Sequence, residues 1–259
     1  MNNEDLRSIA EGLIETFVTA GKESIDIEKQ GVKIKTKEDG SPVTNGDLKV
    51  DKIITDKIIK LTPNIPVISE ETVDLNKKNT LKTFWLIDPI DGTKEYISGG
   101  DEYTLNAGLI INNLPAIGII GVPKKNKIFY SFGKNNSFFI ENQKVTKLNC
   151  KKKTPLGEIK ALTNNENPPE IVLNKLKEFG VTSFRKLSSS YKYCIIATGE
   201  YDLYADKVRA KEWDDAAGHA IAESAGAIVT SLDNKKFKYG KEDYKNPTIL
   251  IKRSNNLND

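Results

Sequence analysis

The sequence predicts a mixed α/β protein. Its first half combines helices with an antiparallel meander, and its second half alternates strands and helices. Three patterns predict this: apolar residues at helical spacing near the N-terminus, short apolar runs separated by turn residues between 104 and 140, and alternating strand and helix patterns from 161 onward. The 259 residues suffice for one large domain or two smaller ones. We expect an N-terminal α+β domain over 1–150 and a C-terminal α/β domain over 151–259.

The first half begins with helical and short strand patterns. Leu6, Ile9, Leu13 and Phe17 recur at helical spacing. Isoleucines and valines then alternate with polar residues, and a charged stretch with glycine and proline follows. The predicted elements are a helix over 6–18, short strands over 25–27 and 32–34, a loop over 35–46, a helix over 47–61, and strands over 67–68 and 84–87.

A meander and an alternating α/β region complete the chain. Strands over 104–111 and 116–122 flank a turn sequence and predict a hairpin, which strands over 128–132 and 137–140 continue. A domain joint is expected near 147–156. The second half predicts a strand over 161–163, a helix over 170–179, a strand over 181–187, a helix over 191–198, a strand over 201–205, a helix over 214–225, and strands over 227–230 and 248–251.

Composition indicates a soluble globular protein. Hydrophobic residues make up 38% and charged residues 29%, and the net charge of +3 predicts neither nucleic-acid nor membrane binding. No apolar run approaches the ~20 residues of a membrane span. Cys150 and Cys194 lack metal or redox spacing and are expected to be reduced thiols. We therefore expect a cytoplasmic monomer or homodimer, with peripheral association on the inner face of the membrane left open.

The residues most indicative of chemistry are acids at the ends of predicted elements. An apolar run leads into Asp88-Pro-Ile-Asp-Gly-Thr93, a second leads to Glu70 and Glu71, and Asp214-Asp215 opens an alanine-rich helix. Singly, such acids are more often solvated loop residues or helix caps. Three clusters in one chain favour a shared metal site.

The ligand chemistry points to magnesium and phosphate. Every candidate ligand is a hard oxygen, and no histidine or cysteine joins the set, so the expected ion is Mg²⁺. Gly92 permits close approach of the backbone, and the residues after it can open a helix whose N–H groups face an anion. A metal beside an anion cradle suggests phosphate chemistry.

These segments resemble the inositol monophosphatase superfamily. Asp88-Pro-Ile-Asp-Gly-Thr93 and Trp213-Asp-Asp-Ala-Ala-Gly218 look like its two signature motifs, and the match continues through Ser41-Pro-Val-Thr44 with Asp47 and through Ser69-Glu-Glu71. Within the superfamily the chain is most similar to the bacterial 3'(2'),5'-bisphosphate nucleotidases. The resemblance implies the layered α-β-α-β-α sugar-phosphatase fold. It also implies lithium-sensitive, Mg²⁺-dependent hydrolysis of 3'-phosphoadenosine 5'-phosphate to AMP and phosphate, a step that clears a by-product of sulfate assimilation.

The resemblance also implies roles for individual residues. Two or more Mg²⁺ ions would activate water and clamp the reacting oxygens. The implied ligands are the carboxylates of Glu70, Asp88, Asp91 and Asp214 and the backbone carbonyl of Ile90. Thr93 and Asp47 match the residues that orient and deprotonate water, and Glu71 would assist. The small phosphorylated substrate is expected to contact Glu70, Ile90, Asp91, Gly92, Thr93, Ser189, Lys192 and Asp214.

Two positions depart from the nucleotidase pattern. Asp206 stands where a basic residue is common, with Lys207 and Arg209 just beyond it, and Asp215 stands where a neutral residue is usual. Asp215 is either exposed or adds negative charge to the metal site. Because Asp206 bears on specificity, an inositol-1-phosphatase or another small sugar-phosphate phosphatase remains an alternative. A catalytically idle binding protein is a third, although all expected ligands are present. The single histidine, His219, is expected to pack or form hydrogen bonds.

Overall fold

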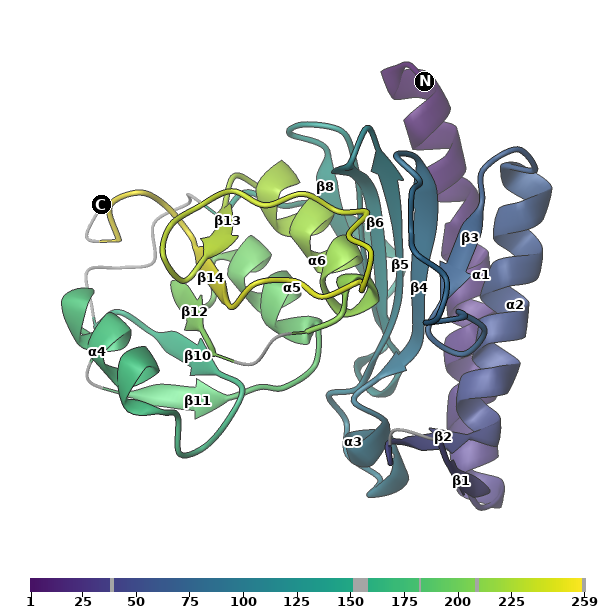
Figure 1. Ribbon diagram of the computed structural model, residues 1–259, viewed down its shortest axis with the longest axis horizontal. Coiled ribbons are helices and arrows are strands. Elements are labelled where there is room, and N and C mark those ends of the chain that lie inside the picture. The colour runs from purple at the N-terminus through teal and green to yellow at the C-terminus, as the bar shows by residue number, and fades with distance from the viewer. Residues whose placement is uncertain (38–39, 151–157, 182, 208–209, 258–259) are drawn as a thin grey trace.

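The computed structural model arranges the chain in five layers, and it describes residues 1–37, 40–150, 158–181, 183–207 and 210–257 (Figure 1). The layers are, in order, helices α1 (Asn3–Gln30) and α2 (Asn45–Leu61), a seven-stranded sheet, helices α5 (Tyr191–Thr198) and α6 (Glu212–Ser224), a five-stranded sheet, and helix α4 (Glu170–Glu178). This α-β-α-β-α order is the one predicted. None of the helices in the described part of the chain has the length and apolar character needed to cross a membrane.

The larger sheet contains the predicted meander and carries two of the acidic clusters at one edge. Its strands follow chain order, and all neighbours are antiparallel except the parallel pair β3 and β4. Because β3 and β4 are parallel, both end at the same edge of the sheet. The glutamates that follow β3 therefore lie near the aspartates at the end of β4. The strands are β3 (Val67–Ser69), β4 (Phe84–Asp91), β5 (Thr104–Ile111), β6 (Leu114–Val122), β7 (Lys127–Phe132), β8 (Ser137–Glu141) and β9 (Lys144–Lys147).

The smaller sheet has the order β11-β10-β12-β14-β13, with β11, β10 and β12 parallel. Its strands are β10 (Ala161–Thr163), β11 (Phe184–Lys186), β12 (Leu203–Ala205), β13 (Ile228–Ser231) and β14 (Ile249–Lys252). One apolar cluster joins Ile120 of the larger sheet to Ile221 of α6 and Ile251 of the smaller sheet. The halves thus share a core, and the boundary near residue 150 stays a prediction. Most of the expected joint, residues 151–156, lies outside the described residues.

The N-terminal region differs from the prediction in two places. The strand predicted over 25–27 was wrong, because α1 continues to Gln30 and ends at Gly31, whose φ of 99° breaks the helix. Its buried face continues through Gly21 and Ser24 at helical spacing, whereas the half-buried Ile25 and Ile27 mimicked strand alternation. The loop predicted over 35–46 contains an antiparallel hairpin of β1 (Ile34–Thr36) and β2 (Pro42–Thr44).

Helix α6 packs directly against strands β5 and β6 because glycines remove the intervening side chains. A Cβ at Gly108 would lie 2.8 Å from the Cβ of Ala216, and a Cβ at Gly118 would overlap the carbonyl oxygen of Ala217. On the helix, a Cβ at Gly218 would overlap the ring of Tyr193. The backbone of α6 therefore lies close to the sheet that carries the other acids.

We expect Gly118→Ala to lower the free energy of unfolding by about 3 kcal/mol, because the added methyl forces α6 away from the sheet. This penalty exceeds the ~0.5–1 kcal/mol that alanine otherwise gains over glycine inside a strand. Gly12→Ala is the matched control: its Cβ would lie 3.5 Å from Leu61, an ordinary contact, so it should be neutral or stabilising. Urea denaturation measures both. A Gly118→Ala protein as stable as wild type would contradict this packing.

Candidate active site

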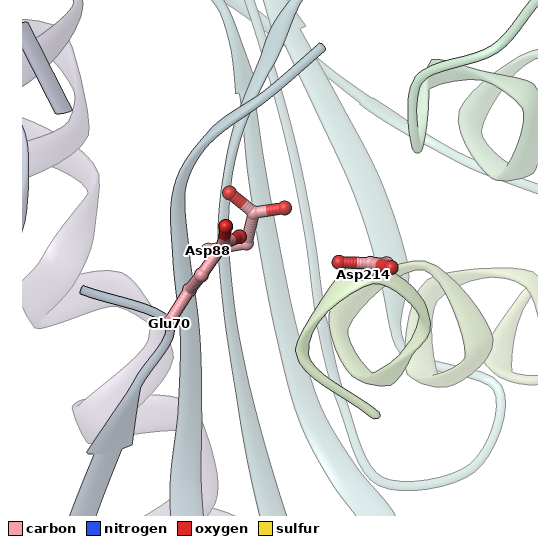
Figure 2. A group of neighbouring side chains, drawn as sticks. All are labelled: Glu70, Asp88 and Asp214. Carbon is pink, nitrogen blue, oxygen red and sulfur yellow. The ribbon is translucent and has the colours of Figure 1, made fainter. Parts of the chain in front are cut away.

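Three carboxylates from different elements converge. Glu70 follows β3, Asp88 lies on β4, and Asp214 lies in the first turn of α6. One oxygen from each lies within 4.8 Å of the others, and Figure 2 shows Asp214 on the helix across from Glu70 and Asp88 on the sheet edge. The backbone N–H of Glu70 donates to the carbonyl of Ile87 at 3.0 Å, which continues the parallel pairing and fixes the position of Glu70. Two separate sheet strands and one helix thus supply the predicted cluster.

The electrostatics of this cluster favour a cation. Burial raises the pKa of Asp88 well above its usual value, and the charges of Glu70, Asp91 and Asp214 raise it further. Burial likewise raises the pKa of Asp214, with Asp91, Asp215 and Glu70 adding to it. Carboxylates packed this closely are stably ionised together only when a positive charge compensates them. Because the donors are all oxygen, the site fits a hard divalent ion.

Asp91, the fourth predicted ligand, lies beside this group at the end of β4. Its Oδ2 accepts hydrogen bonds from the backbone N–H of Ser190 at 2.5 Å and from the Ser190 hydroxyl at 2.6 Å. The carbonyl of Ile90 accepts from the Thr93 hydroxyl at 3.2 Å. Sequence analysis did not identify Ser190 as a site residue. It is one of three consecutive serines before a helix, and nothing in the sequence distinguishes it from the other two.

The proposed water-activating pair is also adjacent. The Thr93 hydroxyl lies 3.5 Å from Oδ1 of Asp47, while Oδ2 of Asp47 accepts from the N–H and the hydroxyl of Thr44 at 2.8 and 2.5 Å. Thr44 and Asp47 form the capping box of α2. Burial raises the pKa of Asp47, and the hydrogen bonds from Thr44 partly offset this. Asp47 is therefore both a helix-capping residue and a neighbour of Thr93.

Glu71 faces a lysine that the sequence did not single out. Nζ of Lys37, just after β1, lies 2.7 Å from Glu70 and 3.0 Å from Glu71. Burial acts to lower the pKa of Lys37, but the hydrogen bonds and charges of the two glutamates outweigh it and raise the pKa to about 12. Burial raises the pKa of Glu71 to about 7 despite the nearby ammonium. A lysine in a charged stretch carries no sequence signal for this role.

The predicted anion cradle forms a short turn of helix. Helix α3 (Thr93–Ile97) begins directly after Gly92, whose φ of 92° lies in the left-handed region that glycine adopts readily. A Cβ at Gly92 would lie 3.6 Å from Glu95 and 3.7 Å from Ser189. Gly92 therefore brings the backbone close to the segment that precedes α5.

A cavity of about 230 Å³ adjoins the acids, and Lys192, Tyr204 and Asp206 help to line it. Nζ of Lys192 lies 3.3 and 3.4 Å from the carbonyl oxygens of Ser189 and Ser188 and about 5.5 Å from the ring centres of Tyr193 and Tyr204. The hydroxyl of Ser189 instead donates to the backbone carbonyl of Glu102. Of the two predicted specificity residues, Lys192 thus borders the cavity directly.

The unusual Asp206 also borders this cavity. It is only 2% exposed, and it accepts from the N–H of Lys207 at 2.7 Å. Its other oxygen lies 3.4 Å from the Tyr204 hydroxyl. Arg209, the other basic residue considered near it, lies outside the described residues. The cavity therefore pairs a cationic side chain with an anionic one.

Asp215 is buried, which excludes the exposed position that the sequence left open. It accepts from the Tyr193 hydroxyl at 2.9 Å and from the side-chain amide of Asn246 at 2.7 Å. Burial raises its pKa, while Lys192 and these donors act in the opposite direction. His219 contacts the Tyr239 hydroxyl at 3.0 Å, which confirms its predicted hydrogen-bonding role.

Comparisons with known proteins agree on one family. The family model described as the inositol monophosphatase family matches residues 2–258. A relative from Escherichia coli O6:H1, named 3'(2'),5'-bisphosphate nucleotidase CysQ, is 33% identical over 218 residues, covering 83% of this chain and 87% of the relative. A relative of the same name from Aggregatibacter actinomycetemcomitans is 28% identical, covering 94% and 92% of the two chains.

Solved structures extend the likeness to three dimensions. The crystal structure of CysQ from Bacteroides thetaiotaomicron superposes with a TM-score of 0.77 at 28% identity, covering 95% of this chain and 97% of that one. An inositol monophosphatase from Thermotoga maritima superposes at 0.74 with 20% identity, covering 93% and 90%. At that lower identity the likeness concerns the fold, which is the layered one predicted.

Proposed function

Because this chain belongs to the inositol monophosphatase family, we propose that it is a 3'(2'),5'-bisphosphate nucleotidase that hydrolyses 3'-phosphoadenosine 5'-phosphate to AMP and phosphate. The observation that carries the phosphatase chemistry is the convergence of Glu70, Asp88 and Asp214 on one point. The similarity to the CysQ nucleotidases supports the substrate. Such an activity would clear a by-product of sulfate assimilation.

The acids would hold two Mg²⁺ ions together with the carbonyl of Ile90. The fit rests on an oxygen-only donor set and on the raised pKa values of Asp88 and Asp214, which a divalent cation would reverse. When bound, Mg²⁺ supplies charge stabilisation to the phosphoryl oxygens and makes water more acidic. Asp91 would contribute through the oxygen that Ser190 does not contact.

Protein groups would position and deprotonate the attacking water. The Thr93 hydroxyl would hold the water and donate toward Asp47, whose raised pKa makes it a better proton acceptor. The backbone N–H groups of Gly92 and Thr93 would bind the phosphate oxygens at the start of α3. Glu71, with a pKa near 7, can exchange a proton at neutral pH and would assist.

A second candidate function is supported by Asp206. Its buried carboxylate lines the cavity next to the acids and would repel a second phosphate placed there. A substrate with one phosphate, such as inositol 1-phosphate, would not incur that repulsion. An inositol-1-phosphatase or related sugar-phosphate phosphatase is therefore the alternative.

A substrate panel tests the proposal. Phosphate release from the purified protein with Mg²⁺ is measured for 3'-phosphoadenosine 5'-phosphate, inositol 1-phosphate and fructose 1,6-bisphosphate, with Asp88→Asn protein as the control for contaminating phosphatases. We expect the adenosine bisphosphate to have the highest kcat/KM. Faster hydrolysis of inositol 1-phosphate would replace the nucleotidase by the alternative. No hydrolysis of any substrate would favour an idle binding protein.

Asp206 and Lys192 should shift substrate preference in opposite directions. We expect Asp206→Asn to raise, and Lys192→Met to lower, the preference for 3'-phosphoadenosine 5'-phosphate over adenosine 3'-monophosphate. Each shift should be about tenfold, because a unit charge in the cavity acts on the second phosphate alone. The measurement is the ratio of kcat/KM values for each variant. Asp56→Asn, which removes an exposed acid from α2, should leave the ratio unchanged. Equal changes on both substrates would assign these residues a structural role.

We infer a cytoplasmic location from the cysteines. Cys150 and Cys194 are both buried, and the structure does not join them to each other in a disulfide. Thiols that stay reduced are typical of cytosolic proteins.

A further inference from the structure

Ser190 joins residues that come from three different elements. It is fully buried and immediately precedes α5. Its hydroxyl contacts Oδ2 of Asp91 at 2.6 Å and the backbone carbonyl of Asp214, and it lies 3.3 Å from the side-chain nitrogen of Asn106 on β5. Its N–H adds the 2.5 Å bond to Asp91. One small side chain thus links an acid of the larger sheet to the helix that carries the acid of the second half.

The contacts with Ser190 restrict how Asp91 presents its carboxylate. Both donors of Ser190 approach the same oxygen, Oδ2, so Oδ1 is left for a cation. An aspartate side chain at a strand end otherwise rotates among several conformers. Groups that hold a metal ligand in one orientation raise the affinity of the site for its ion.

Asn106 donates a hydrogen bond to the Ser190 hydroxyl. In the register of β4 and β5, Asn106 pairs with Asp88, which places it directly beside the cluster. Its side-chain nitrogen can only donate, so the Ser190 oxygen accepts from it. The single hydroxyl proton is then shared between two acceptors, the Asp91 carboxylate and the Asp214 carbonyl. Both acceptors belong to residues that the proposed function places at the metal site.

We propose that Ser190 is a positioning residue for the metal site, which holds Asp91 next to Asp214 across the junction between the two halves and thereby sets the affinity for Mg²⁺. The proposal rests on the proposed function for the identity of the ion. Ser190 itself touches neither substrate nor cation. Its loss therefore affects metal affinity first and substrate affinity little.

The test compares Mg²⁺ binding to the wild type and to Ser190→Ala by isothermal titration calorimetry, without substrate. We expect Ser190→Ala to weaken binding about tenfold. The Mg²⁺ concentration for half-maximal phosphate release should rise by a similar factor. The KM for substrate at saturating Mg²⁺ should change less than twofold. Ser190→Thr keeps the hydroxyl and should restore most of the affinity.

Ser137→Ala is the matched control. Ser137 is also fully buried, and its hydroxyl donates to the carbonyl of Ile221 in α6 at 3.0 Å. The control therefore removes a buried hydroxyl that contacts the same helix, but at a position distant from Asp214. It should leave Mg²⁺ binding unchanged. If Ser137→Ala weakens Mg²⁺ binding as much as Ser190→Ala, the role of Ser190 is merely to anchor α6 and the proposal is overturned.

A second variant keeps the proposal testable if Ser190→Ala folds poorly by circular dichroism. Asn106→Leu should weaken Mg²⁺ binding about threefold, because the Ser190 hydroxyl loses a hydrogen-bond donor that helps to hold it in place. If Ser190→Ala folds and its Mg²⁺ binding is unchanged, the inference is overturned. If only Asn106→Leu folds, unchanged Mg²⁺ binding in that variant overturns it. Calorimetry also separates it from the proposed function. Wild-type protein that binds Mg²⁺ but releases no phosphate overturns the function alone.

Discussion

Replacing Asp91 with asparagine should lower the turnover of phosphate release by at least about 100-fold, because in the proposed mechanism Asp91 supplies one of the charges that hold the cations against the reacting phosphate. Asparagine has nearly the same shape, and its oxygen can still accept the two hydrogen bonds from Ser190. The fold should therefore persist. Removing a carboxylate from a group with raised pKa values should leave the metal-free protein as stable as wild type, or more stable.

Turnover at saturating Mg²⁺ and substrate, together with thermal unfolding by circular dichroism, measures this prediction. Asp56→Asn serves as the control, since Asp56 is an exposed acid on α2 paired with Lys52 and its loss changes the net charge equally. It should keep wild-type turnover. Near wild-type turnover in a folded Asp91→Asn protein would remove Asp91 from the metal site.

Thr93→Ala and Asp47→Asn should each lower turnover by about 100-fold while changing Mg²⁺ affinity less than threefold. The two side chains lie 3.5 Å apart, and the proposed mechanism has them act as one unit that orients and deprotonates water. The double variant should then be little worse than the poorer single variant. Because Asp47 accepts the proton in its ionised form, wild-type activity should fall as the pH drops through its raised pKa. In Asp47→Asn the part of this acidic limb that comes from Asp47 should be absent, while the part that comes from the other acids should remain.

Thr93→Ser is the control for this pair, because it keeps the hydroxyl and should retain most of the activity. Asp47 also caps α2 through Thr44, so unfolding must be measured alongside turnover. A missing cap costs about 1 kcal/mol and leaves the protein folded at 25 °C. Losses that simply multiply in the double variant would show that Thr93 and Asp47 act separately.

The meander and the α/β half were predictable because their elements are apolar runs bounded by turn residues. Strands β5 and β10 and helix α5 have the boundaries that the sequence predicted. Helix α1 was predicted too short because its last turns are only half-buried, so the apolar spacing weakens there while the helix continues. Strand β9 was not predicted, since its largely exposed residues carry no apolar pattern.

The acids of the site were predictable because each cluster is local in sequence, and the structure brings Glu70, Asp88 and Asp214 together. Lys37 and Ser190 were not. Lys37 meets glutamates 33 and 34 residues away, and Ser190 meets Asp91 99 residues away. A lysine in a charged stretch or a serine before a helix looks ordinary until the chain has folded. The proposed roles of Lys37 and Ser190 follow from the acidic side chains that they contact in the folded protein.

The two glycines that face α6 affect how far the halves of the protein can move apart when substrate binds. At Gly108 and Gly118 the larger sheet lies directly against the backbone of α6, and this close packing leads us to expect little relative movement of the two halves. We therefore expect the small-angle scattering profile to be the same with and without bound nucleotide. Amide exchange in α6 should likewise be slow in both states.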